Sequence, residues 1–536
     1  MASLIPGRLG RVAPGATASQ SVLGDLRLQR TLRAHLRKAD RGPVAMAGAL
    51  VREERLKNGM RVLIAERHAD PVVSVLLLYR VGARNESERE AGVSHFLEHM
   101  MFKGTPRFGK GEVDRITTEL GGQNNAFTGY DHTAYWFELA SDRWETALDL
   151  EADRMHGLLL DPREFDSERA VVLEELSMGE DDPWRVLARR VEQALFPRHP
   201  YGRPIIGFED TLNAMTPQDM RDYYRRFYHP ANATLVLCGD VRPRRALAAV
   251  RERFGSLDAG PGYEEADGFR PPLAAPEGPA RIEARWADPG RRLCMAWSTA
   301  PVGSDDDYAL DLVAAILSSG RLSRLQRRLV LREGLATSLS TSNDTRVEGG
   351  VFWLMAECAQ GVEPAALERA IDEELARLAN EPVTADERKR ALGLLDASEA
   401  FDAETVTDVA EEIGAFAVDF EWRAAYDGGV RHREVRAKHI QDAVRRLLSP
   451  ERRVVGWSLS IEEPVATTKA SKRKKAKKAK ATAKPAARKK AAKAARKATG
   501  QRTRASAKTT KPKRKAKAKA KAKAKGAAAA TKRRRT

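Results

Sequence analysis

Two histidines and a glutamate lie within five residues of one another, in the segment His95-Phe96-Leu97-Glu98-His99. On a helix, residues four apart project from the same face, so the imidazoles of His95 and His99 would lie side by side. Two neutral imidazoles suit a zinc ion. Glu98 would face a zinc-bound water without filling the coordination sphere, take its proton and deliver one to a leaving amine. The spacing therefore predicts a hydrolytic zinc centre in which Glu98 is the base.

Two histidines leave such a centre incomplete, because a hydrolytic zinc takes three protein ligands and keeps one position open. The third ligand is expected to be a carboxylate from another helix, and the stretch 166–178 contains Glu168, Glu174 and Glu175. Glu168 and Glu175 are seven residues apart and share a helical face, whereas Glu174 points about 100° away from Glu175. A solvated surface helix is the alternative. The apolar neighbours of the histidines argue against it, because imidazoles and carboxylates in an apolar helix need a partner.

The elements that would position these residues alternate between strands and helices, in an order that occurs twice. The clearest pair is MTPQDMRDYYRRFYHPANATLVLCGDV and VRAKHIQDAVRRLLSPERRVVGWSLSI, whose prolines, Pro230 and Pro450, are 220 residues apart. This period is far longer than that of a solenoid repeat, so it indicates a duplicated domain. The Gly- and Pro-rich stretch 259–279 is the expected joint.

Hydrophobic patterning predicts the elements of both copies. Strands are expected at 60–66, 72–80, 134–139, 233–238, 281–286, 292–299 and 350–357. Helices are expected at 92–102, 144–160, 164–178, 217–227, 306–319 and 364–379. The two histidines and the three glutamates therefore fall on two different helices of the first copy.

With these features together, the chain resembles the pitrilysin/insulinase-type zinc peptidases, closest to the two-domain group that includes bacterial homologues of mitochondrial processing peptidase. The signature of that family is HxxEH followed by a Glu 76 residues after the second His, which is Glu175 here. A Glu seven residues upstream, a partner of the site, matches Glu168. The resemblance covers about 49–460 and includes the duplication, in which only the first copy bears zinc. Here the stretch 313–319, 220 residues after His99, contains no His or Glu.

The resemblance implies a zinc-dependent metalloendopeptidase with one Zn²⁺ per chain. It assigns the metal to His95, His99 and Glu175, and the catalytic roles to Glu98 and Glu168. It also implies an α+β fold of two homologous domains, each a mostly antiparallel sheet flanked by helices. In the family the two domains face each other across a cavity that selects extended or unfolded peptides.

The stretch Gly121–Tyr135 resembles the family's edge strand, which pairs with the substrate backbone. The matching, substrate-binding positions are Asn125, Ala126, Phe127 and Thr128. Main-chain pairing gives orientation with little side-chain preference. The alternative is an ordinary strand entry with a turn. His132 follows Asp131 in the expected loop and is not expected to be a ligand.

One departure from the family concerns the second domain, which there supplies an Arg and, seven residues later, a Tyr that stabilise the oxyanion. Val330 and Thr337 stand at these positions, and Arg327, Arg328 and Arg332 are the neighbours that would substitute. A missing donor costs ~10²–10³ in rate. The chain would then be weak alone, use another donor, or form a homo- or hetero-dimer with a related subunit. The alternative function is a non-catalytic or partner-dependent subunit of a two-chain peptidase.

The net charge of +19 is divided between a mildly acidic body and a basic tail. Residues 464–536 contain 31 of the 93 Lys and Arg residues and no Asp or Glu, so residues 1–463 carry 62 basic and 74 acidic residues. The tail is mostly Lys, Arg and Ala and lacks large apolar residues, so we expect it to be disordered. Its charge favours sequence-independent binding of nucleic acid or another polyanion. The alternative is a solubilising appendage.

The expected domain order has five parts. They are an N-terminal extension, expected to be disordered (1–48), a zinc-bearing peptidase domain (49–258), a linker (259–279), a homologous inactive domain (280–463) and the disordered tail (464–536). No run of about 18 apolar residues occurs, which excludes a transmembrane segment. The N-terminal residues lack the pattern of a secretory signal, and the three cysteines are far apart, so we expect a cytoplasmic protein. The mitochondrial matrix and the periplasm are the alternatives.

Overall fold

The computed structural model describes residues 44–46, 49–261, 273 and 278–461. The predicted tail and most of the predicted N-terminal extension lie outside the described residues, as does part of the predicted linker. Below, the first half of the chain means residues 44–261 and the second half means residues 278–461. No helix in the described ranges is long and apolar enough to cross a membrane.

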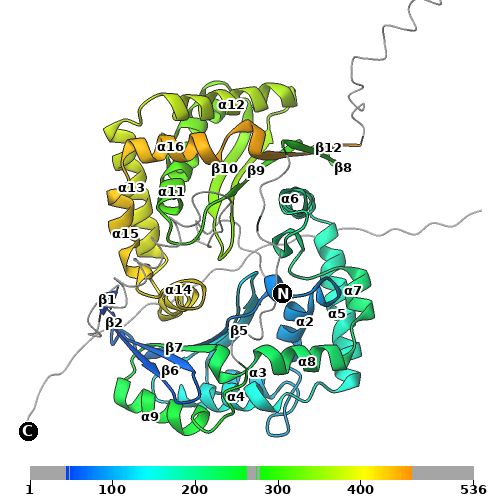
Figure 1. Ribbon diagram of the computed structural model, residues 1–536, viewed down its shortest axis with the longest axis vertical. Coiled ribbons are helices and arrows are strands. Elements are labelled where there is room, and N and C mark those ends of the chain that lie inside the picture. Colours follow the sequence, from blue (N-terminus) through cyan, green and yellow to red (C-terminus); the bar gives the residue numbers. More distant parts are fainter. Residues whose placement is uncertain (1–43, 47–48, 262–272, 274–277, 462–536) are drawn as a thin grey trace, which may run out of the picture. The chain divides into compact units, whose positions relative to one another are not determined.

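The first half forms a seven-stranded sheet in the order β1-β2-β3-β7-β4-β6-β5 (Figure 1). The strands are β1 (Val44–Met46), β2 (Ala49–Arg55), β3 (Arg61–Glu66), β4 (Val72–Tyr79), β5 (Gln123–Thr128), β6 (Thr133–Ala140) and β7 (Ala233–Gly239). Neighbours are antiparallel except β3 and β7, which are parallel. The apolar run of β7 is buried along its whole length because the strand is central and covered on both faces.

The second half forms a five-stranded sheet in the order β10-β11-β9-β12-β8. Its strands are β8 (Ala280–Trp286), β9 (Arg292–Thr299), β10 (Ala336–Asp344), β11 (Gly350–Cys358) and β12 (Arg453–Ser460). Only β8 and β12 run parallel. The order β8-β12-β9-β11-β10 therefore repeats β3-β7-β4-β6-β5 with the same strand directions. This confirms the predicted α+β fold of two related domains with mostly antiparallel sheets.

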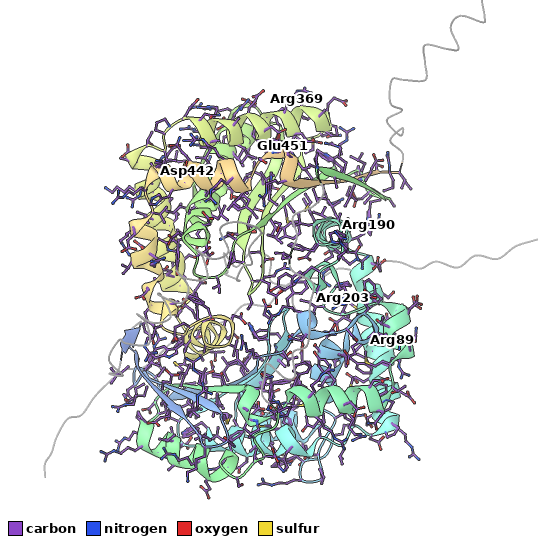
Figure 2. The ribbon with its side chains drawn as sticks, in the orientation of Figure 1. Arg89, Arg190, Arg203, Arg369, Asp442 and Glu451 are labelled. Atoms are coloured by element: carbon purple, nitrogen blue, oxygen red, sulfur yellow. The ribbon has the colours of Figure 1, made fainter. Side chains whose placement is uncertain are left out.

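Helices flank both sheets. In the first half they are α2 (Val93–Met100), α3 (Glu112–Glu119), α4 (Glu145–Gly157), α5 (Pro162–Glu180), α6 (Pro183–Leu195), α7 (Glu209–Ala214), α8 (Pro217–Phe227) and α9 (Pro243–Phe254). In the second half they are α11 (Asp305–Ser318), α12 (Pro364–Asn380), α13 (Ala385–Phe401), α14 (Val406–Asp419), α15 (Ala424–Glu434) and α16 (Ala437–Leu447). A π-helical turn spans Gln326–Arg332. Charged residues such as Arg369 and Glu451 are exposed, as Figure 2 shows.

Two helices lie on the sheet of the opposite half (Figure 1). α6 packs on β12, β9 and β8, and α14 packs on β4 and β7. The apolar residues of α14, among them Val409 and Ile413, share one buried cluster with Leu76 and Val236 of the first sheet. Burying this surface is a main source of stability, so each half completes the core of the other.

Candidate metal centre

The helix that carries both histidines, α2, is fixed by its apolar face. Phe96, Leu97 and Met100 are fully buried in the core of the first half. The Phe96 ring lies against Phe165 of α5, with 4.6 Å between the ring centroids. Because α2 and α5 pack together here, side chains on their adjoining faces meet.

A buried carboxylate holds the first turn of α2. Glu86 accepts hydrogen bonds from the backbone N–H groups of Gly92 and Ser94, both at 2.9 Å. Burial raises the pKa of the Glu86 carboxyl to about 7, although the two N–H bonds oppose this shift. Gly92 has a φ of 95°, and a Cβ there would lie 2.5 Å from the carbonyl oxygen of Ile206. Glu86 was not predicted from the sequence; the signal that could have indicated it is the start of a helix with no capping side chain of its own.

The structure brings His95, His99 and Glu175 together. One ligand atom from each residue lies within 4.8 Å of the other two. The Nε2 atoms of His95 and His99 lie 3.8 Å and 3.6 Å from Oε2 of Glu175. The long helix α5 places Glu175, and it begins at Pro162 with the Asp161 side chain accepting from the backbone N–H groups of the first turn.

Glu168 lies two turns before Glu175 on the same face of α5 and contacts the other ring nitrogen of His99. Its Oε1 lies 3.0 Å from His99 Nδ1, and its Oε2 lies 2.5 Å from Nζ of Lys103. Burial alone would lower the pKa of His99, but the hydrogen bond to Glu168 and the nearby carboxylates outweigh it and raise this pKa. An Nδ1–H that donates to Glu168 leaves the Nε2 lone pair facing Glu175. Lys103 was not singled out from the sequence.

The remaining histidine of the motif is uncharged. Burial, followed by the proximity of His99, lowers the pKa of His95 to about 3. Two imidazole nitrogens and one carboxylate oxygen converge, which is a donor set that suits Zn²⁺. The residues present therefore fit the metal that the motif predicts, and Glu174 does not belong to the cluster.

Glu98 lies on α2 next to this cluster and contacts the end of strand β5. The hydroxyl of Thr128 donates to Glu98 Oε2 at 2.5 Å. Burial raises the pKa of the Glu98 carboxyl, while the Thr128 hydrogen bond and His99 lower it. The Thr128–Glu98 contact could not be predicted from the sequence, since the two residues lie 30 positions apart with no pattern joining them.

Strand β5 carries the four predicted substrate-binding residues. It lies at one end of the first sheet and pairs with β6 alone among the described strands. Asn125 and Phe127 are exposed, and Ala126 and Thr128 are half-buried. β5 packs beside α2, and the side chain of Thr128 at the end of the strand contacts Glu98.

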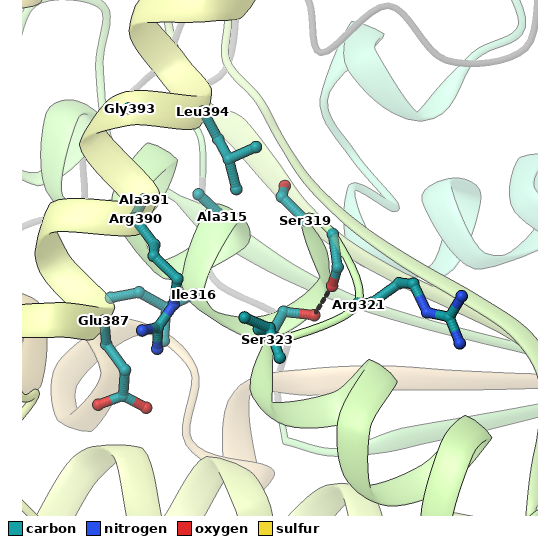
Figure 3. Close-up of a pocket in the computed structure, with 12 residues that line it drawn as sticks. Ala315, Ile316, Ser319, Arg321, Ser323, Glu387, Arg390, Ala391, Gly393 and Leu394 are labelled. Carbon is teal, nitrogen blue, oxygen red and sulfur yellow. Dashed lines mark hydrogen bonds between the residues drawn. The ribbon is translucent and has the colours of Figure 1, made fainter.

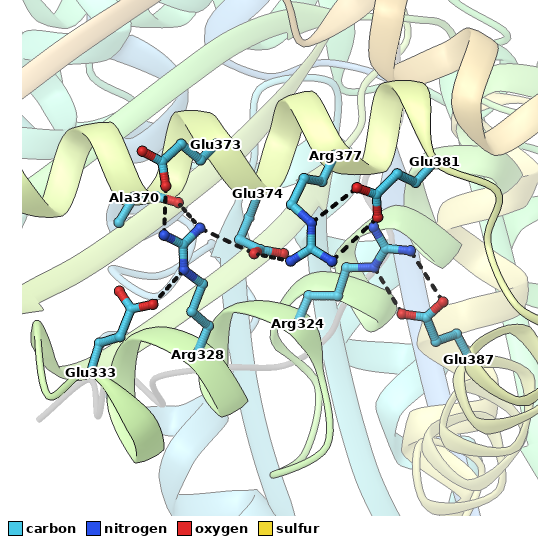
Figure 4. A network of polar contacts seen from close by, with 9 residues as sticks. All are labelled: Arg324, Arg328, Glu333, Ala370, Glu373, Glu374, Arg377, Glu381 and Glu387. Carbon is cyan, nitrogen blue, oxygen red and sulfur yellow. Dashed lines mark hydrogen bonds and ion pairs between the residues drawn. The ribbon is translucent and has the colours of Figure 1, made fainter.

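The second half supplies no residue to this cluster, and the predicted substitute Arg328 is engaged elsewhere. Arg328 pairs with Glu333 at 2.7 Å, Glu373 at 2.5 Å and Glu374 at 3.1 Å (Figure 4). These contacts tie the π-helical turn to α12. Thr337 is exposed on β10.

His132, which was not expected to be a ligand, lies outside the cluster of His95, His99 and Glu175. Its Nδ1 lies 3.1 Å from a carboxylate oxygen of Asp419 on α14.

A pocket of about 370 Å³ lies in the second half, between the C-terminal end of α11 and α13 (Figure 3). Its lining includes Ala315, Ser319, Arg390 and Leu394 and contains no histidine. It therefore has no counterpart of the convergent donors in the first half.

The fold and the site together indicate the class of protein. The fold has two related sheet-plus-helix domains, and the first domain carries the cluster of two histidines and one glutamate. The family model described as insulinase (peptidase family M16) matches residues 61–209, and the model described as peptidase M16 inactive domain matches residues 214–395. The chain belongs to the M16 (insulinase) peptidase family.

Three similar proteins agree with this assignment. An uncharacterized zinc protease of Mycobacterium leprae is 31% identical over 358 residues, which are 67% of this chain and 80% of the relative. The zinc protease PqqE of Helicobacter pylori is 30% identical over 340 residues, 61% of this chain and 74% of the relative. The crystal structure of a protease from Helicobacter pylori superposes with a TM-score of 0.72 at 25% identity, covering 77% of this chain and 99% of that chain.

Proposed function

We propose that this protein is a zinc metalloendopeptidase that hydrolyses extended or unfolded peptides and holds one zinc ion per chain. The observation that carries the proposal is the convergence of His95, His99 and Glu175 beside the partly buried carboxylate of Glu98. The names of the relatives as zinc proteases support the same metal and reaction.

His95, His99 and Glu175 would hold the metal. When bound there, zinc supplies Lewis acidity, which lowers the pKa of water and polarises a peptide carbonyl. Glu168 orients the His99 ring by accepting from Nδ1, and Lys103 holds the second oxygen of Glu168. Such outer contacts fix the tautomer of a ligating histidine.

Glu98 acts as the general base and then as the general acid. Its carboxylate takes the proton of the attacking water and delivers a proton to the leaving amine. Burial raises the pKa of this carboxyl, which makes the carboxylate a stronger base for the first of these transfers.

The substrate would bind as an added strand along β5. The outer edge of β5 offers backbone N–H and C=O groups between Asn125 and Thr128, beside Glu98. Pairing of this kind accepts an extended chain and holds it by its main chain, so folded proteins would be poor substrates.

A second candidate is the partner-dependent subunit of a two-chain peptidase. Val330 and Thr337 stand at the oxyanion positions of the family, and Arg328 is bound by three glutamates. A homologous partner would then complete the site.

We also propose that the protein acts in the cytoplasm and that the basic residues 464–536 bind nucleic acid or another polyanion.

The test uses the full chain and a quenched unstructured peptide. We expect cleavage of the peptide to stop after chelation and to return when zinc is added. A folded substrate with the same number of residues as the peptide should stay intact. Stoichiometric zinc without cleavage would favour the partner-dependent subunit. Neither zinc nor cleavage would overturn the proposed function.

A further inference from the structure

The turn between β5 and β6, residues 129–132, is held by a buried ion pair. The guanidinium Nε of Arg84 lies 2.9 Å from Oδ1 of Asp131, and the two side chains are 2% and 3% exposed. The hydroxyl of Tyr201 donates to the same carboxylate at 2.8 Å. Charges this deeply buried keep a fixed geometry, because any loss of partner leaves a charge without solvent.

The second half of the chain completes this cluster through the loop 345–349, between β10 and β11. The backbone N–H of Val347 donates to Asp131 Oδ2 at 3.2 Å. The backbone N–H of Glu348 donates to the Tyr201 hydroxyl at 3.0 Å, and the Glu348 carboxylate lies 3.0 Å from Arg84.

The other residues of the turn are held as well. His132 pairs with Asp419 of α14 at 3.1 Å. The Tyr130 hydroxyl donates to Glu192 at 2.9 Å, and Glu192 pairs with Arg346 of the second half. The carbonyl of Gly129 accepts from the backbone N–H of Ala83 at 3.1 Å. Every residue from 129 to 132 therefore has a partner that fixes it.

Thr128 comes immediately before this turn, and its hydroxyl donates to Glu98. A short series of contacts therefore joins the second half to the proposed base. Loop 345–349 contacts Asp131, the turn that contains Asp131 follows Thr128 directly, and Thr128 contacts Glu98. The three-bond side chain of Glu98 has several rotamers, and a single donor at 2.5 Å selects among them.

We propose that Thr128 is a positioning residue for Glu98, and that the second half of the chain fixes Thr128 through the Asp131 turn. The inference rests on the proposed function of Glu98 as the base. The second half, which has no ligand in the proposed metal site, would thereby contribute to the reaction at the site in the first half. Misplacement of a reacting group by about 1 Å costs about 10²-fold in rate, so the positioning has a measurable consequence.

The experiment measures kcat, KM and bound zinc for full-length variants on the quenched peptide. Thr128→Val keeps the branched shape and removes the donor. We expect kcat to fall about 10²-fold with KM and zinc unchanged, and Thr128→Ser to recover most of kcat. Thr118→Val, an exposed threonine on α3, is the matched control and keeps the wild-type kcat.

Glu348→Gln tests the contribution of the second half. We expect a roughly tenfold fall in kcat on its own and less than about twofold in the Thr128→Val background, because both changes act on one path. Asp419→Asn is the second variant should Glu348→Gln fail to fold, and we expect the same pattern from it.

Three results would overturn the inference: a wild-type kcat in Thr128→Val, an effect on KM alone, or effects of Glu348→Gln and Thr128→Val that multiply. All three presuppose an active wild type. An inactive wild type with zinc added counts instead against the proposed function.

Discussion

Two regions of this molecule share a fold and differ in chemistry. α2 and α5 pack together in the first half, and α11 and α13 pack together at the corresponding places in the second half. Between the first pair lie His95, His99 and Glu175, whereas between the second pair lies a pocket lined by residues such as Ala315, Ser319 and Leu394 (Figure 3). The same strand order supports a donor cluster in one half and an apolar pocket in the other. Function therefore follows the side chains at the site and not the sheet beneath them.

The two helices also begin differently. α11 is capped locally, because the Ser304 side chain accepts from the backbone N–H of Asp307. α2 has no such cap and depends on Glu86, six residues before Gly92. The start of the histidine-bearing helix thus depends on a carboxylate outside the helix, whereas the start of α11 is held by Ser304 and by Asp307 of its own first turn, which accepts from the backbone N–H of Gly303 at 3.1 Å.

The largest expected effect tests whether the metal belongs to the first half alone. His99→Ala removes one of three donors, so we expect the protein to lose its zinc and all measurable cleavage. Metal analysis after dialysis and the peptide assay check this. His156→Ala, an exposed histidine on α4, is the control and should keep both. Full zinc occupancy in His99→Ala would show that the zinc is not held by the cluster of the first half.

The next effect separates the base from the metal ligands. Glu98→Gln keeps the size of the side chain and its contact with Thr128 but cannot take a proton. We expect kcat/KM to fall about 10²–10⁴-fold with zinc unchanged. Glu174→Gln, on α5 but outside the cluster, should leave both values as they are. Equal activity of Glu98→Gln and wild type would mean that another group is the base.

A smaller effect concerns the start of α2 and its dependence on pH. The pKa of Glu86 is raised from 4.5 to about 7, so the folded state binds more protons than the unfolded state between these values. The free energy of unfolding should therefore fall as pH rises through this window, by about 3 kcal/mol in total, and level off above it.

Glu86→Gln should remove this fall. Melting temperatures of wild type and variant at about pH 5 and about pH 8 measure the difference. Glu88→Gln, an exposed neighbour, is the control. A pH profile of Glu86→Gln that parallels the wild type would show that Glu86 does not titrate in this window.

The smallest effect tests whether Arg328 serves only its own half. Because three glutamates bind it at a partly exposed site, Arg328→Gln should lower the free energy of unfolding by about 1 kcal/mol or less. We expect kcat within about twofold of wild type in the peptide assay. A fall of about 10²-fold would instead make Arg328 an oxyanion donor and bring the second half into direct contact with the substrate.

The sequence predicted the features that depend on local pattern or on fixed spacing. The strands and helices that were predicted from hydrophobic periodicity each match an element of the structure, and the α+β class with two related domains is confirmed. Other elements, among them β2, β10, α6, α13 and α14, were not predicted. The helical spacing of His95 and His99 and of Glu168 and Glu175 anticipated which side chains share a face.

Contacts through space were not predictable. Lys103 beside Glu168, Thr128 beside Glu98 and Glu86 at the start of α2 each join segments with no shared period. The packing of α6 and of α14 on the sheet of the other half was not predicted either, because an apolar helical face does not indicate which sheet it covers. All of these depend on the tertiary arrangement, which a single sequence does not display.

A zinc titration of the chelated full chain, followed by the rate of peptide cleavage, tests directly whether one zinc ion per chain is needed for the reaction. We expect a rate that rises linearly and stops rising at one zinc per chain, with Glu98→Gln binding the same single zinc and cleaving about 10²–10⁴-fold more slowly. Cleavage by the chelated chain without zinc, or a break at a different stoichiometry, would contradict this expectation.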